Sequence, residues 1–228
     1  MSPRLVGFAG PAGVGKSSAA ELLAAEGGWR LVSFADPLRA LALALHPEWT
    51  LVDVVGARKD EVRPVSPLGW TAMEDVLAEH VQALTGHRLD VWSRVFEWVP
   101  ARVLSELQQA MSPRQTHRLL GDFIKSLYPS AFTQRAEQTS GMALMQGQSV
   151  VLDDVRFEPE AAMIRGLGGT VVHMQRDGVA FRRDHDSEMG VAVAAVDLHL
   201  VNRGDLRTLR GELYRVLGPG RRVREDAA

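Results

Sequence analysis

The sequence predicts an α/β protein, a three-layer fold with a five-stranded parallel sheet and a helical insertion. Short apolar runs recur along the chain, and most are followed by a segment with the composition of a helix, a pattern typical of parallel strands buried on both faces. A glycine-rich stretch at residues 10–17 joins the first apolar run to the first helical segment. The chain has 228 residues, of which 46% are apolar and 24% charged, so it can bury the core of a single domain.

Five strands are expected, each short, apolar and rich in residues that favour strands. They are residues 5–9, 30–34, 149–152, 170–174 and 197–201. Helices are expected at about residues 18–25, 38–45, 71–84, 113–128, 131–145, 158–167 and 206–217. We expect one domain over residues 1–228, in which residues 37–146 form a mostly helical insertion between the second and third strands.

Two of these helices are predicted to begin at a capping box, in which a Ser or Thr and a Glu or Gln three residues later bond each other's backbone N–H groups. Thr71 with Glu74, and Ser112 with Gln115, fit this pattern. The capping boxes therefore predict where both helices start.

Two segments of the insertion have no clear periodicity. Residues 47–69 contain prolines and mixed charges and are expected to be rich in loops. Residues 86–100 carry Trp92, Phe96 and Trp98. Packing of these aromatic side chains in a core is the preferred interpretation, and stacking on a base is the alternative.

The stretch at residues 10–17 fits the phosphate-binding P-loop motif, G-x-x-x-x-G-K-[ST], between a strand and a helix. Its glycines allow positive φ angles and a close approach to an anion, so that backbone N–H groups and the helix N-terminus point at phosphate. We expect Lys16 to neutralise the β- and γ-phosphates of ATP and Ser17 to bind Mg²⁺. A glycine-rich turn with a chance Lys-Ser pair is the alternative. The predicted ATP-binding residues in this region are Gly10, Ala12, Gly13, Val14, Gly15, Lys16, Ser17 and Ser18.

Polar residues lie at or just after the ends of predicted strands, where α/β proteins bind ligands. Asp153 or Asp154 is predicted to bind Mg²⁺, and the alternative is a carboxylate that caps the next helix. Asp36 is predicted to orient the acceptor or a metal-bound water, or to serve as the N-cap before Pro37. The polar residues at these strand ends are Asp36, Asp153, Asp154, Arg176 and Asn202.

Arginine side chains are expected to hold the acceptor phosphate and the transferred group, because the guanidinium matches phosphate oxygens. Arg156 is the strongest candidate because it lies two residues after the acidic pair, and it joins Lys16, Asp36 and Arg176 in the predicted catalytic set. Residues 176–190 are polar and long enough to form a lid over the nucleotide. The arginine candidates are Arg39, Arg114, Arg118, Arg156, Arg176, Arg182 and Arg183.

These blocks resemble the deoxynucleoside monophosphate kinases, a P-loop kinase family found largely in phages. The resemblance implies transfer of the ATP γ-phosphate to a deoxynucleoside 5′-monophosphate, with Asp36 and Arg156 near the acceptor and Asn202 near the ATP base. The matching blocks are residues 10–17, Phe34-Ala-Asp-Pro-Leu-Arg39, Asp154-Val-Arg-Phe157 with Glu160, His185-x-Ser-Glu188, and Asp197-Leu-His-Leu-Val-Asn202. The predicted acceptor-binding residues are Asp36, Arg39, Arg114, Arg118, Asp154 and Arg156. The predicted lid residues are Arg182, Arg183, His185, Ser187 and Glu188.

The chain departs from the family pattern where the acceptor base is expected to bind. Arg118 stands where the pattern Arg-x-x-x-Gln-x-x-Gly has Gln, and Gly121-Asp-Phe replaces a Gly-Thr-acidic run. A modified pyrimidine nucleotide such as 5-hydroxymethyl-dUMP is therefore a candidate acceptor. Two alternatives stay open: a dephospho-CoA kinase, which shares the P-loop and an Asp-to-Asn final strand, and an ATP-binding module without catalysis.

Composition narrows the expected partners. A net charge of −2 argues against nucleic acid, and the lack of cysteine excludes disulfides and thiolate metal sites and suits a reducing compartment. The first strand follows the N-terminus without a signal peptide, and no apolar run has the length of a membrane helix. We expect a cytoplasmic protein (in the host cytoplasm if phage-encoded) that binds small-molecule nucleotides and no nucleic acid or membrane, with formation of a homodimer left open.

Overall fold

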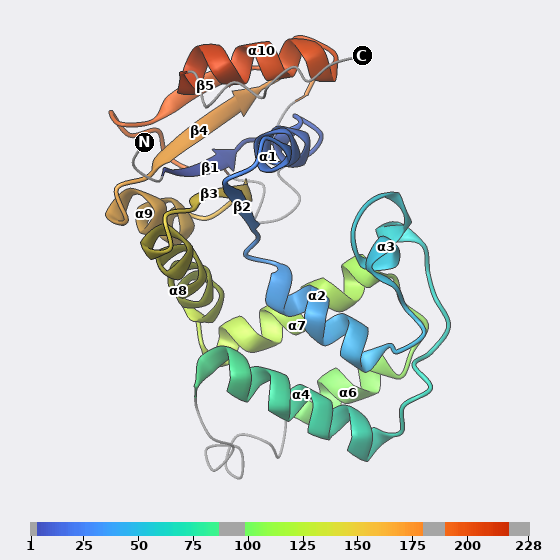
Figure 1. Cartoon of the computed structure of the whole chain (residues 1–228). Helices are drawn as coiled ribbons and strands as arrows, with labels where there is room; N and C mark the ends of the chain where they lie inside the picture. The colour runs from blue at the N-terminus through green and yellow to red at the C-terminus, as the bar shows by residue number, and fades with distance from the viewer. Residues whose placement is uncertain (1–3, 87–98, 180–189, 219–228) are drawn as a thin grey trace. The chain divides into compact units, whose positions relative to one another are not determined.

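The computed structural model describes residues 4–86, 99–179 and 190–218 (Figure 1). The chain divides into two compact units. The sheet unit comprises Met1–Phe34 and Ala136–Ala228, and the helical unit comprises Ala35–Arg135. Among the residues described, no helix is long and apolar enough to cross a membrane.

The sheet unit contains a five-stranded sheet in the order β2-β3-β1-β4-β5, and every pair of neighbouring strands is parallel. This result confirms the predicted fold class. The first strand pairs with β3 and β4, so β3 lies between the first two strands of the chain. The strands are β1 (Leu5–Ala9), β2 (Trp29–Val32), β3 (Ser149–Val155), β4 (Thr170–Gln175) and β5 (Leu198–Val201).

Helices cover both faces of this sheet and complete the three layers (Figure 1). Alternate side chains of β1 point to opposite faces, as the pleat of a strand requires. Val6 and Phe8 pack with α1 (Lys16–Ala25) and α10 (Leu206–Leu217). Leu5 and Ala9 pack on the other face with α9 (Glu158–Gly166) and the second half of α8 (Ala131–Met145). The arrangement is consistent with a P-loop kinase fold.

The helical unit has its own apolar core, formed by buried side chains such as Leu41, Met73, Leu77, Leu104 and Leu120. These residues come from different helices and are fully or almost fully buried, so the unit buries a continuous core. Its helices are α2 (Asp36–Leu45), α3 (Leu51–Val54), η1 (Ala57–Asp60), α4 (Trp70–Thr85), α6 (Val99–Leu107) and α7 (Pro113–Leu127).

Several details differ from the sequence-based expectations. Helix α2 begins at Asp36 with Ala35 as its N-cap, so the alternative that Asp36 is the N-cap before Pro37 is wrong. The second strand covers Trp29–Val32 and does not reach residue 34.

Asp153 and Asp154 lie within β3 and not after it, because strand pairing continues beyond the apolar run that ends at Leu152. Helix α4 begins at Trp70 with Gly69 as its N-cap, so the predicted capping box at Thr71 is wrong. Residues 87–98, including the three aromatic residues considered above, lie outside the described residues.

The capping box at Ser112 is confirmed. The Ser112 Oγ accepts a hydrogen bond from the Gln115 N–H at 3.3 Å, and the Gln115 Oε1 accepts one from the Ser112 N–H at 2.8 Å. Pro113 occupies the first helical position, where its missing N–H removes no intrahelical bond.

This contrast predicts different effects of two similar substitutions. Ser112→Ala removes a capping acceptor and should lower the free energy of unfolding by about 1 kcal/mol. Thr71→Ala removes an exposed hydroxyl that caps nothing and should change it by less than about 0.5 kcal/mol. Urea denaturation followed by circular dichroism measures both, and equal losses would contradict the assignment of the two helix starts.

Candidate functional site

The glycine-rich loop between β1 and α1 has the backbone conformation that anion binding needs. Gly10 has a φ of 144° and Gly15 a φ of 104°, both in the region that favours glycine. A Cβ atom at Gly10 would lie 2.6 Å from the Met174 carbonyl oxygen, and one at Gly15 would lie 2.6 Å from the Asn202 Nδ2. Both positions therefore require glycine for space as well as for conformation.

The Lys16 side chain is folded into this loop. Its ammonium group donates hydrogen bonds to the carbonyl oxygens of Gly10 at 2.7 Å and Pro11 at 3.0 Å. The same Nζ atom lies 3.3 Å from the Asp154 Oδ1. The side chain is 8% exposed, so a positive charge is held at the centre of the loop with little access to water.

Asp154 lies between two cations. Its Oδ1 faces Lys16, and its Oδ2 accepts a hydrogen bond from the Arg156 Nε at 2.5 Å. The backbone N–H groups of Arg156 and Phe157 both donate to the Glu160 Oε2, at 2.7 and 3.0 Å. Glu160 thereby fixes the turn after β3 that carries Arg156, whose side chain stays 33% exposed and is accessible to a ligand.

The residues present suit Mg²⁺, a cation that prefers oxygen ligands. Ser17 is exposed in the first turn of α1, and Asp153 is buried at the end of β3. The Asp154 Oδ1 is also buried, and apart from its ion pair with Lys16 it accepts no hydrogen bond from the described residues. Within the described residues there is no cluster of three metal-ligating side chains.

Asn202 directly follows β5, and its side chain is hydrogen-bonded to the glycine-rich loop. Its side-chain Nδ2 donates to the Val14 carbonyl oxygen at 2.8 Å, and its Oδ1 accepts from the Gly204 N–H at 3.3 Å. The residue is 3% exposed. The structure thus gives Asn202 a part in positioning the loop, while its predicted contact with the ATP base stays a prediction.

An open pocket of about 450 Å³ adjoins the start of the loop. Gly10 and Pro11 line one side, and Arg176 lies at the end of β4 on the same pocket. His199 and Val191 contribute further parts of its lining. The pocket lies at the carboxyl ends of β4 and β5, the edge at which α/β proteins bind ligands.

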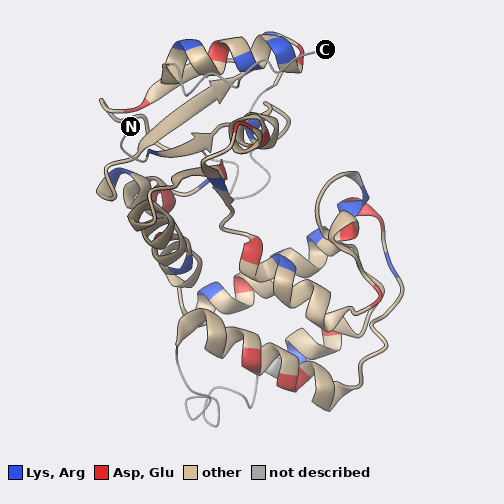
Figure 2. Cartoon of the chain, viewed as in Figure 1, with Lys and Arg blue, Asp and Glu red and all other residues tan. Residues whose placement is uncertain are grey.

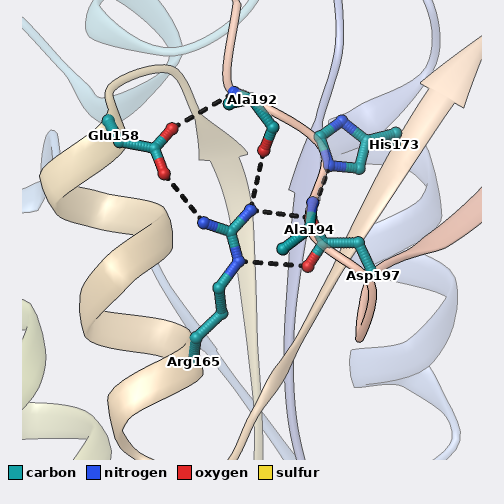
Figure 3. Close-up of polar contacts among 6 residues, drawn as sticks. All are labelled: Glu158, Arg165, His173, Ala192, Ala194 and Asp197. Atoms are coloured by element: carbon teal, nitrogen blue, oxygen red, sulfur yellow. Dashed lines mark hydrogen bonds and ion pairs between the residues drawn. The ribbon is translucent and has the colours of Figure 1, made fainter.

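A network of polar contacts holds one wall of this pocket (Figure 3). The Arg165 guanidinium, on α9, makes two hydrogen bonds to the Asp197 carboxylate, at 3.1 and 2.7 Å. It also donates to the Glu158 Oε1 and to the Ala192 carbonyl oxygen, both at 2.8 Å. The Asp197 Oδ2 lies 2.9 Å from the His173 Nε2.

The pKa of Asp197 reflects this network. Burial alone would raise the pKa of the carboxyl group, but hydrogen bonds from Arg165, the Ala194 N–H and His173 outweigh burial and hold the pKa well below its usual range. The hydrogen bond to Asp197 in turn raises the pKa of Arg165. Both groups are therefore ionised at neutral pH.

Further predicted site residues belong to the helical unit, whose helices α2 and α7 carry basic positions (Figure 2). Asp36 begins α2 and accepts a hydrogen bond from the Arg39 Nη1 at 2.8 Å. Arg114, on α7, forms two hydrogen bonds with Asp60, which lower the pKa of that carboxyl group. Arg118 lies one turn further along α7 and is exposed.

His117 lies close to several positively charged side chains of the helical unit. Burial, together with the positive charges of Arg39, Lys59 and Arg114, lowers the pKa of His117 to about 4. The imidazole is therefore neutral at pH 7, surrounded by cations. Neither His117 nor Asp60 was predicted from the sequence, because no motif distinguishes them from other polar residues of the insertion.

The structure thus brings together Lys16, Asp154 and Arg156 around the glycine-rich loop, with Ser17 in the first turn that follows it. Asp36, Arg39, Arg114 and Arg118 lie in the helical unit. The predicted lid residues Arg182, Arg183, His185, Ser187 and Glu188 lie outside the described residues. Sequence reasoning missed Arg165, because an arginine in the last turn of a helix resembles any solvated helix end.

The lowered pKa of Asp197 predicts how stability depends on pH. A carboxyl group with a depressed pKa in the folded state stabilises the fold above its unfolded pKa, and this contribution is lost as the pH falls through the folded value. The free energy of unfolding should therefore fall as the pH drops below about 4, and Asp197→Asn should weaken that dependence. Thermal unfolding from pH 7 to pH 2 measures it. Asp75→Asn, on the exposed face of α4, is the matched control, and a pH dependence unchanged by Asp197→Asn would contradict the assignment.

The chain is similar in sequence to a viral protein over most of its length. No protein-family model matches the chain. A protein of Acanthamoeba polyphaga mimivirus named "Putative deoxynucleotide monophosphate kinase" is 27% identical over 203 residues, which cover 87% of this chain and 88% of the viral protein. The similarity therefore extends far beyond the glycine-rich loop.

Proposed function

We propose that this protein transfers the γ-phosphate of ATP to a deoxynucleoside 5′-monophosphate and releases the diphosphate. The observation that carries the proposal is the placement of Asp154 between Lys16 of the glycine-rich loop and Arg156. The first cation belongs to a motif for the phosphates of a donor, and the second is exposed enough to reach another phosphate. The name of the mimivirus protein, "Putative deoxynucleotide monophosphate kinase", supports the same class of acceptor.

Phosphoryl transfer depends mainly on positioning and on stabilising negative charge. The N–H groups of the loop and the N-terminus of α1 would hold the β- and γ-phosphates, and Lys16 would leave its carbonyl partners for the phosphate oxygens. Mg²⁺ bound to Ser17 and to Asp153 or Asp154 would neutralise the phosphates further. Arg156 would orient the acceptor phosphate through its guanidinium.

The acceptor base is assigned to the helical unit, where Asp36, Arg39, Arg114 and Arg118 are the proposed contacts. A Cβ atom at Gly121 would lie 3.4 Å from the Leu38 Cδ1, so this glycine allows α7 to pack closely against α2. Arg118 in place of the usual Gln changes the hydrogen-bonding groups on that helix. A modified pyrimidine such as 5-hydroxymethyl-dUMP is therefore included among the proposed acceptors.

An acceptor screen tests the function. The protein is incubated with Mg-ATP and a panel of natural and modified deoxynucleoside monophosphates, with dephospho-CoA as a competing acceptor, and the products are identified by mass spectrometry. We expect a diphosphate from at least one nucleotide, and Lys16→Ala should lower its rate at least about 100-fold because a charge on the transferred group is lost. Turnover of dephospho-CoA alone, or ATP hydrolysis without transfer, would overturn the proposal.

Arg156→Ala tests the acceptor side. If Arg156 contacts the acceptor or the moving phosphoryl group, kcat should fall about 100-fold while the KM for ATP changes by less than about threefold. Steady-state kinetics with each substrate varied in turn separates the two constants. Arg203→Ala, which removes an exposed arginine at the end of β5, is the control. A normal kcat with weaker ATP binding would contradict the role given to Arg156.

A further inference from the structure

We propose that Arg165 is a positioning residue for the donor nucleotide, because it fixes the chain segment that forms one wall of the pocket beside the glycine-rich loop. The inference rests on the proposed function, in which that loop holds the phosphates of ATP. No motif of the sequence assigns a role to Arg165, which lies in the last turn of α9.

The segment in question, residues 190–197, is held by side chains and not by strand pairing. Arg165 donates to the Ala192 carbonyl oxygen at 2.8 Å, and Glu158 accepts from the Ala192 N–H at 3.1 Å. The Ala194 N–H donates to the Asp197 Oδ2 at 2.8 Å. Arg165 and Glu158 therefore bind both backbone polar groups of Ala192, and Asp197 binds the N–H group of Ala194, two residues further on (Figure 3).

The same segment lines the pocket. Gly190, Val191 and Val193 contribute to its lining, as do Gly10 and Pro11 of the glycine-rich loop. The residues bound by the network alternate with the residues that line the pocket. A shift of the network would therefore move the wall relative to the loop.

The chemistry of the network suits a rigid support. Guanidinium is planar and presents several donors in a fixed fork, so one side chain binds the Asp197 carboxylate at two points and still reaches Glu158 and Ala192. The Asp197 side chain is fully buried, and Arg165 is 18% exposed, so water competes weakly for these bonds. Lysine at position 165 would keep the charge but lose this fork.

Loss of the Arg165 network is expected to affect binding of the donor nucleotide and not binding of the acceptor. Every contact in the network, the pocket wall and the phosphate-binding loop belongs to the sheet unit, whereas most of the proposed acceptor contacts belong to the helical unit. Loss of the Arg165 fork should therefore weaken binding of ATP and leave the acceptor constant almost unchanged.

The test compares Arg165→Gln, Arg165→Lys and Asp197→Asn with the parent protein, and adds the milder Glu158→Gln in case the others fold poorly. Arg215→Gln, which breaks an exposed ion pair with Glu212 on α10, is the matched control. The dissociation constant of Mg-ATP is measured by calorimetry, the KM of each substrate by steady-state kinetics, and the melting temperature by calorimetric scanning.

We expect Arg165→Gln and Asp197→Asn to raise the ATP dissociation constant about tenfold, since small displacements in a binding site have large effects. Glu158→Gln should raise it about threefold. Arg165→Lys should lie between Arg165→Gln and the parent, and the acceptor KM and the Arg215→Gln control should stay at parental values.

Two results would overturn the inference: unchanged ATP affinity in variants that have only a lower melting temperature, or a change confined to the acceptor KM. Because the dissociation constant needs no turnover, its outcome is separate from the acceptor screen. If the variants raise the ATP dissociation constant as expected but the parent protein phosphorylates no acceptor, the proposed function is refuted and this inference stands.

Discussion

The contacts of the Asp154 carboxylate with Lys16 and Arg156 are the interaction on which the candidate site depends. Two cations close together repel each other, and a carboxylate between them turns that repulsion into attraction. Lys16 is almost fully buried, so its charge needs this partner and the two loop carbonyls to be tolerated. The same carboxylate fixes the direction of Arg156, which links the glycine-rich loop to the turn after β3.

The parallel sheet explains why this interaction forms. Neighbouring parallel strands bring their carboxyl ends to one edge, so β1 and β3 place the loop and the acidic pair side by side. Asn202 reaches the loop from the end of β5 in the same way. These side chains lie far apart in the sequence, but they meet because the strands that carry them end at the same edge of the sheet.

The glycine-rich loop and the five strands, apart from some of their ends, could be predicted from the sequence, because each depends on a local pattern. The role given to Arg156 stays a prediction. The end of β3 could not be predicted, because Asp153 and Asp154 break the apolar run although their backbone still pairs. The start of α4 was also misjudged, because the chain has already become helical at Trp70 when it reaches Thr71. Local propensity decides such boundaries less than packing does.

The polar networks were beyond sequence reasoning for a different reason. Arg165 and Asp197 are 32 residues apart, and Arg114 and Asp60 are 54 apart, so no spacing rule connects either pair. Only the fold shows which of many arginines meets which carboxylate. The roles of Asp36, Arg39 and Arg118 in acceptor binding remain predictions for the same reason.

The strand order has a consequence for how the chain reaches its native state. The first strand pairs with β3 and β4, so in a nascent chain the apolar β1 segment has no strand partner until β3, about 140 residues later in the sequence, has been made. Such long-range pairing slows folding, because a large loop must close before its contacts can form. The helical unit, which is complete in sequence before β3 emerges, is free to fold in the interval.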